Sequence, residues 1–181
     1  MSRANGRSGA SGADQEFDDL MAALLPDLVR YFARRIPDAH AAVDCAADTA
    51  LIMYERFTQL PISADERRAW AFGIARNVRS SHLRKSVRRL EIDDALREVL
   101  VGEISDVAEV ASRNEQINQV LRALPTLSSA DQELLTLVVW DELQVQQAGA
   151  VVGLNPTAAR KRYERARNRW RKAYAGLGSE A

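Results

Sequence analysis

Cationic side chains crowd one short stretch near the C-terminal end of this 181-residue chain. Between residues 160 and 172 a single acid, Glu164, opposes eight of them. Arginine and lysine at this density can neutralise phosphates and release the counterions of a nucleic acid, although such a run is more often only a solvated helix face. The eight are Arg160, Lys161, Arg162, Arg165, Arg167, Arg169, Arg171 and Lys172.

The residues before and within this stretch have the pattern of a helix-turn-helix. Gly149 is small enough to let a following helix cross closely, and Gly153 is placed for the left-handed conformation that ends a helix. Asn155 can cap the next helix, and Pro156 suits its first position, where no N–H is needed. That helix carries one apolar stripe, at Ala159, Tyr163, Ala166, Trp170 and Ala173.

The turn, the cap and the apolar stripe occur together with the charge run, and this combination favours DNA binding over a solvated face. In the major groove, side chains near the start of the second helix reach the edges of the bases. The candidate duplex-binding residues are Thr157, Arg160, Lys161, Glu164 and Arg165.

A second basic helix is predicted to start at Ser63 or Asp65 and to run to about Lys85. One of its faces holds Trp70, which we interpret as a core residue rather than a stacking platform. The other face interleaves cations with an aromatic ring. Rings stack on splayed bases while guanidinium groups follow the phosphates, so this face suits a single strand. Its residues are Arg68, Phe72, Arg76 and Arg79.

Three carboxylates, Asp44, Asp48 and Glu55, share one face of a predicted helix with Leu51. Three interpretations stay open: a carboxylate metal site, a plain solvated face, and an acidic and apolar face that docks onto a basic partner helix. A metal-dependent hydrolase would add Asp38 to the set, but no nucleophile or general base accompanies it. We therefore expect neither an enzyme nor a cofactor.

The net charge is zero, with 46% hydrophobic and 28% charged residues, which indicates one or two small globular domains. This neutrality hides a basic block over 76–89 and an acidic stretch over 91–115. Cys45 is the only cysteine, so no internal disulfide can form. No apolar run approaches the roughly 20 residues of a membrane helix, and no hydrophobic signal core begins the chain. We expect a cytoplasmic protein without a membrane partner.

No strand pattern competes with the helical periodicity, so the predicted fold is all-α, with two small helical domains joined by an acidic linker. Further helices are predicted over 17–35 with a kink or restart at Pro26, over 39–57, over 107–124, and from Ser128 or Ser129. The predicted boundaries are a disordered tail at 1–14, a first domain at 15–89, a linker at 90–105, a second domain at 106–176 and a tail at 177–181.

Three stretches taken together resemble the bacterial extracytoplasmic-function sigma factors, the minimal two-domain type of RNA polymerase specificity subunit. "AVDCAADTAL" at 42–51 and "RRAWAFGIARNVRSSHLRKSVRR" at 67–89 resemble sigma region 2. The stretch from "LRALPTLSS" to "KRYERAR", at 121–167, resembles sigma region 4. The order and separation of these motifs are more specific than any one of them.

The resemblance implies three surfaces and their partners. The acidic helix, with Asp44, Asp48, Leu51 and Glu55, is expected to bind the beta-prime clamp helices of core RNA polymerase. The helix at 67–89 and the loop before it are expected to bind and help melt the minus-ten promoter element. The second domain is expected to bind the minus-thirty-five duplex and the beta flap, and an anti-sigma factor is a further partner. The motif adds two residues to the single-strand set, Asn77 and Arg84.

One alternative of a different class remains, a stand-alone helix-turn-helix regulator that dimerises on a palindrome. It predicts tight and specific DNA binding without polymerase. It gives no reason for the second basic helix.

Overall fold

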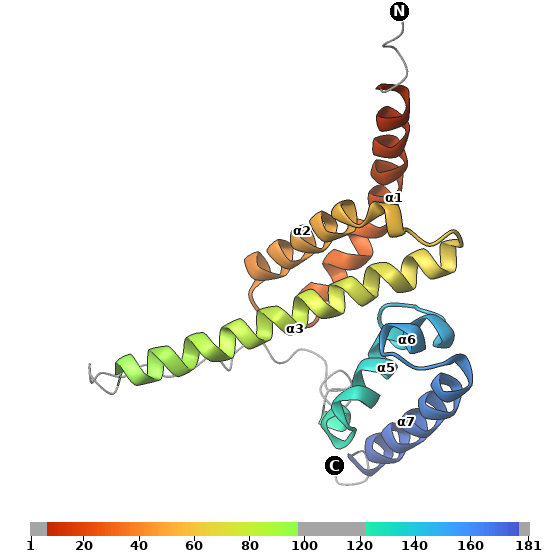
Figure 1. The fold of residues 1–181 in the computed structure, drawn as a ribbon. Helices are drawn as coiled ribbons and strands as arrows, with labels where there is room; N and C mark the ends of the chain where they lie inside the picture. The colour runs from red at the N-terminus through yellow and green to blue at the C-terminus, as the bar shows by residue number, and fades with distance from the viewer. Residues whose placement is uncertain (1–6, 98–121, 178–181) are drawn as a thin grey trace, which may run out of the picture. The chain divides into compact units, whose positions relative to one another are not determined.

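The computed structural model describes residues 7–97 and 122–177, and every regular element within these ranges is helical (Figure 1). The predicted all-α class is therefore confirmed. The chain divides into two compact units, Met1–His82 and Leu83–Ala181, which we call the N-terminal and C-terminal units. The elements are α1 (Arg7–Ala33), α2 (Ala39–Glu55), the 3-10 helix η1 (Phe57–Gln59), α3 (Ala64–Arg97), the 3-10 helix η2 (Leu124–Thr126), α5 (Ser129–Val139), α6 (Val145–Val151) and α7 (Pro156–Leu177).

α1 differs from its prediction at its start and at its proline. It begins at Arg7, so the prediction of disorder over residues 1–14 is wrong from that residue onward. The Tyr54 hydroxyl of α2 lies 3.4 Å from Oδ1 of Asp14, a long-range contact at the edge of this segment. The helix also continues through Pro26, so it does not restart there.

α3 is longer than predicted. It continues past Lys85 to Arg97 and enters the range that we assigned to an acidic linker. No glycine or proline occurs between Lys85 and Gly102, and a change in the sign of the charges does not by itself end a helix. The rest of that linker and nearly all of the helix predicted at 107–124 lie outside the described residues.

The core of the N-terminal unit is aromatic. Tyr31 and Phe32 of α1 and Phe72 of α3 have no exposed surface. The ring centroid of Tyr31 lies 5.1 Å from that of Phe32 and 5.6 Å from that of Phe72, both edge-on, which is a favourable aromatic geometry. Cys45 of α2 is also buried. These contacts pack α1 against α3.

The core of the C-terminal unit is aliphatic and lies where α5 and α7 meet. Leu134 and Leu137 of α5 and Ala159 and Ala166 of α7 are fully buried. Elsewhere on and just after α5, Leu135 is buried, while Val138 and Trp140 are half-buried. None of the described helices combines the length and apolar composition needed to cross a bilayer.

Candidate nucleic-acid interface

The turn between α6 and α7 is built as its sequence predicts. Gly153 has φ +77°, which is the left-handed region, and the Leu154 N–H donates to the Gly149 carbonyl at 2.8 Å. The Ala158 N–H donates to Oδ1 of Asn155 at 2.9 Å, and α7 begins at Pro156. Contacts among neighbouring residues, from Gly149 to Ala158, therefore fix the turn and the start of α7.

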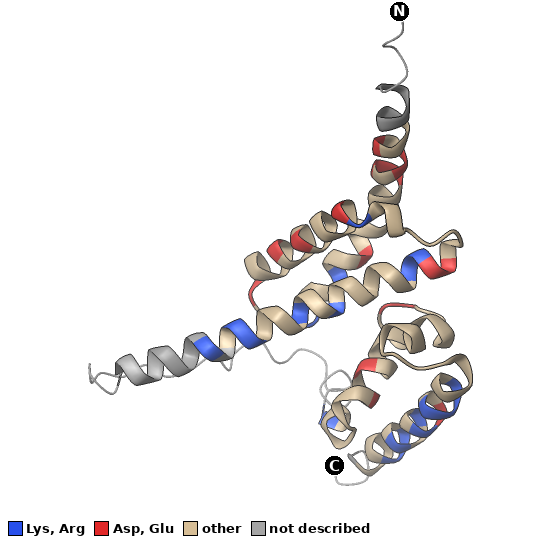
Figure 2. Cartoon of the chain, viewed as in Figure 1, with Lys and Arg blue, Asp and Glu red and all other residues tan. Residues whose placement is uncertain are grey.

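α7 has a buried row and a basic, exposed row. Ala159 and Ala166 are fully buried, while Tyr163, Trp170 and Ala173 are half-buried, so the predicted apolar stripe faces inward. Figure 2 shows lysine and arginine along most of the rest of the helix. All the predicted duplex-binding residues are exposed, namely Thr157, Arg160, Lys161, Glu164 and Arg165.

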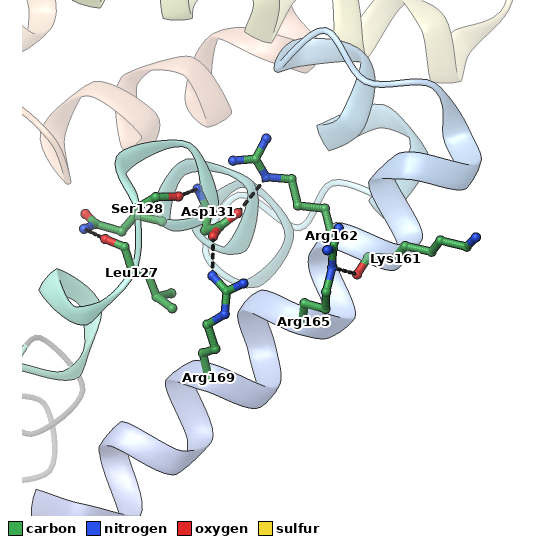
Figure 3. A network of polar contacts seen from close by, with 8 residues as sticks. Leu127, Ser128, Asp131, Lys161, Arg162, Arg165 and Arg169 are labelled. Carbon is green, nitrogen blue, oxygen red and sulfur yellow. Dashed lines mark hydrogen bonds and ion pairs between the residues drawn. The ribbon is translucent and has the colours of Figure 1, made fainter.

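Two of the arginines on α7 bind an acid within the same unit (Figure 3). Nε of Arg162 donates to Oδ1 of Asp131 at 2.6 Å, and Nη1 of Arg169 donates to Oδ2 of Asp131 at 3.2 Å. The Asp131 N–H donates to Oγ of Ser128 at 3.3 Å, so Ser128 caps α5 as predicted. The sequence analysis did not select Asp131. The sequence shows only an acid in the first turn of α5, and the burial of that acid and its contact with α7 appear only in the fold.

Asp131 is charged in this environment. Burial by itself would raise its pKa, but hydrogen bonds from Arg162 and Ser128 and the positive charges of Arg162 and Arg169 outweigh that effect. The pKa of Asp131 is therefore lowered. A carboxylate that is shared by two guanidinium groups fixes the orientation of both.

The predicted single-strand residues do not form one exposed face. Asn77 and Arg84 are exposed on α3, and Arg76 and Arg79 are half-buried. Nη2 of Arg68 lies 2.9 Å from Oδ2 of Asp27, so this arginine links α3 to α1.

Phe72 cannot stack on a base, so its placement in the single-strand set is wrong. Its side chain is fully buried and packs edge-on against Tyr31. Trp70, in contrast, is half-buried rather than enclosed. α3 buries residues on both sides, because Ile74 and Val78 on the Trp70 side are buried as well as Phe72.

An exposed aliphatic residue that the sequence analysis did not select lies just before α3. Ile62 is 94% exposed in the loop between η1 and α3. Nε of Arg67 donates to the carbonyl of Pro61 at 2.8 Å, and Nη2 of Arg67 lies 3.3 Å from Oε1 of Glu16. The loop is thus held against α1 while Ile62 projects into solvent. An isoleucine between a proline and the cap of the next helix was the signal.

α2 presents an acidic and apolar surface to solvent. The predicted residues Asp44, Asp48 and Glu55 are exposed, and so is Leu51, whose side chain is 57% exposed. Figure 2 shows these acids spaced along one helix. In the part of the chain that the structure describes, no three His, Cys, Asp or Glu side chains are grouped as metal ligands. Two further apolar residues on α2 are exposed, Val43 and Tyr54.

Comparison with known proteins gives two family matches in one order. Residues 20–89 match the model of sigma-70 region 2, and residues 117–169 match the model of sigma-70 region 4. Together these matches cover more than half of the chain. No curated protein matches it.

A solved structure has the same fold. It is the sigma factor RpoE from Bartonella quintana, crystallised in complex with the anti-sigma factor NepR. The TM-score is 0.62 at 24% sequence identity, over 88% of this chain and 96% of the other. With an all-α fold and both sigma-70 regions in sequence, the chain belongs to the sigma-70 family of RNA polymerase sigma factors and to its extracytoplasmic-function type.

Proposed function

We propose that this sigma factor reads promoter DNA with two separate helical surfaces and holds core RNA polymerase with a third. A sigma factor directs core polymerase to promoters, so each surface has a defined task. α7 would bind duplex, α3 with its preceding loop would bind single strand, and α2 would bind polymerase.

The exposed start of α7 carries the proposal. Thr157, Arg160 and Lys161 lie within two turns of the Asn155 cap, and all three are exposed. The buried alanines on the opposite side hold the helix to the unit and leave this face free for the major groove. Each two-pronged contact from such a side chain to a base contributes about 1–3 kcal/mol of discrimination. We therefore assign α7 to the minus-thirty-five element.

We assign the single-strand task to a smaller set of residues than the sequence pattern suggested. Asn77 and Arg84 are exposed on α3, and Ile62 is exposed in the loop before it. An apolar side chain can contact an unstacked base where the buried Phe72 cannot. Removing a base from the stack costs a few kcal/mol. Contacts to that base and to its phosphates would offset this cost at the minus-ten element.

The exposed face of α2 is assigned to core polymerase. Leu51 and Val43 leave more than half of their side chains in water, and Asp44 and Asp48 lie on the same helix. An apolar patch with an acidic border fits a basic helical partner, because burial supplies affinity and charge supplies orientation. The beta-prime clamp helices are the partner that we propose. The beta flap is the proposed partner of the C-terminal unit.

An anti-sigma factor is a further proposed partner. The structurally similar RpoE was crystallised with the anti-sigma factor NepR. A partner that covered the apolar patch on α2 would compete with polymerase. Such competition would keep the chain from promoters without any chemical change to it.

Run-off transcription tests the proposed function. Core polymerase and a library of random upstream sequences are incubated with and without the full chain, and the start sites are sequenced. We expect defined start sites only when both proteins are present. Arg160→Ala should reduce their use, whereas Arg171→Ala should not, although it removes an equal charge later in α7. Tight DNA binding by the chain alone, with no start sites, would instead support a stand-alone regulator.

A further inference from the structure

An open cavity of about 240 Å³ lies between the start of α5 and the side of α7. It is lined by Asp131 and by three arginines, Arg162, Arg165 and Arg169. Figure 3 shows the side chains of Arg162 and Arg169 reaching toward Asp131 from positions about two turns apart on α7. The cavity is therefore bordered almost entirely by charged groups.

The charges in this cavity do not balance. Three guanidinium groups surround one carboxylate, and the Asp131 side chain is only 8% exposed because two of the arginines already cover it. The three arginines donate hydrogen bonds within the unit through Nε of Arg162, Nε of Arg165 and Nη1 of Arg169. A guanidinium carries five N–H donors, so each arginine keeps further donors for a ligand. The ligand that this arrangement suits is an oxyanion.

The position of the cavity on α7 indicates which oxyanion. Residues 162, 165 and 169 are three and four apart, so they follow one side of the helix. Arg165 also lies four residues beyond Lys161, and it therefore borders the exposed face that we assign to the major groove. A helix in the major groove has the phosphates of the duplex along its sides. The side of α7 that holds the cavity would therefore lie against the phosphates of one DNA strand.

We propose that the arginine cavity binds one phosphate group of the DNA backbone beside the groove that α7 occupies. The inference rests on the proposed binding of duplex by α7 and adds a site for it. Arg165 and Arg169 supply donors to the phosphate oxygens, and Arg162 completes the positive border. Phosphate contacts of this kind carry no sequence information, but they set the register of a helix on the duplex.

Asp131 acts in this site as a positioning residue. It holds Arg162 at 2.6 Å and Arg169 at 3.2 Å, so neither guanidinium has to be ordered when DNA binds. Its carboxylate also lines the cavity, but the side chain is only 8% exposed and three guanidinium groups outnumber it there. Asp131→Asn should therefore weaken duplex binding at every promoter by a similar factor, and it should leave the preference among promoters unchanged.

The test uses holoenzyme and a promoter duplex chosen by the run-off experiment described above. Single phosphates along the minus-thirty-five element are replaced, one at a time, by neutral methylphosphonates, and the affinity of holoenzyme is measured. We expect one replacement to weaken wild-type binding about tenfold and to have no effect on Arg169→Gln. Arg171→Gln removes the same charge outside the cavity and should stay sensitive to that replacement. In Arg169→Gln the slope of log K against log salt should be less steep by about 0.9. This is the change expected when one phosphate contact is lost.

A second variant guards against a change in folding. Arg165→Gln leaves both ion pairs of Asp131 in place, so it should keep the thermal stability of the wild type while losing sensitivity to the same phosphate. The proposal is overturned if all replacements affect the wild type and Arg169→Gln equally, or if Arg169→Gln weakens core polymerase binding instead. The proposal is also overturned if inorganic phosphate binds in the cavity while no methylphosphonate replacement changes the affinity for DNA. The site would then bind a free anion. Failure to find any start site would count against the proposed function itself.

Discussion

Gly149 and Ala159 are in contact across the turn of the helix-turn-helix. A Cβ atom built on Gly149 would lie 2.4 Å from the Cβ atom of Ala159, which is closer than real side chains approach. Ala159 is fully buried and has no rotatable side chain that could move aside. The distance between α6 and α7 is therefore set by the absence of a side chain at position 149.

Gly149→Ala should destabilise the C-terminal unit by about 1–3 kcal/mol, because the added methyl group forces the two helices apart. The measurement is amide hydrogen exchange of α6 and α7 in the full chain. Gly73→Ala is the matched control, since a Cβ atom there meets nothing within 4 Å. It should stabilise α3 by roughly 0.5–1 kcal/mol through the better helix propensity of alanine. Equal effects of the two substitutions would contradict the close contact.

Acid should weaken the contact between α5 and α7 through Asp131. The pKa of this carboxyl is lowered in the folded chain, so its contribution to stability is present above the ordinary aspartate pKa of about 3.9. The contribution is lost as the pH falls through the lower folded pKa. The hydrogen-exchange protection factors of α5 and α7, which correct for the intrinsic pH dependence of exchange, should therefore fall more between pH 5 and about pH 3 in the wild type than in Asp131→Asn. An identical acid response in both proteins would show that Asp131 is not stabilised by its arginines.

Leu51→Ala should weaken binding to core polymerase by about 1 kcal/mol, or roughly fivefold in Kd, because less apolar surface is buried. The thermal stability of the free chain should stay the same, since 57% of the Leu51 side chain is in water. Leu25→Ala, at a residue of α1 that is 39% exposed and that we assign to no partner, serves as the control. If the two variants bind polymerase equally well, the apolar face of α2 is not the docking surface.

Phe72→Ala should destabilise the N-terminal unit by about 3–5 kcal/mol, because it leaves a cavity beside Tyr31. Phe72→Leu should cost less, since it refills part of the space. Binding of the folded Phe72→Leu chain, within holoenzyme, to a minus-ten single strand should match the wild type. A stable Phe72→Leu chain that has lost this binding would restore the stacking role that its burial argues against.

The sequence alone determined the helix-turn-helix and the start of α7. Gly153, Asn155 and Pro156 act through the backbone within a few residues, by a left-handed turn, a side-chain cap and a missing N–H. Such signals need no distant partner. Apolar residues that recur every three or four positions likewise determined an all-α fold. A helix must bury one side wherever it packs, so this spacing is needed whatever its partner.

The tertiary structure decided which side of each helix meets which partner. α3 carries apolar residues on two sides, and Phe72 is buried because Tyr31 of α1 lies opposite it. The arginines of α7 look alike in the sequence, yet Arg162 and Arg169 bind Asp131 from 31 and 38 residues away. Contacts over such separations depend on how the helices cross. Local sequence patterns do not encode that geometry, and only the folded chain brings the partners together.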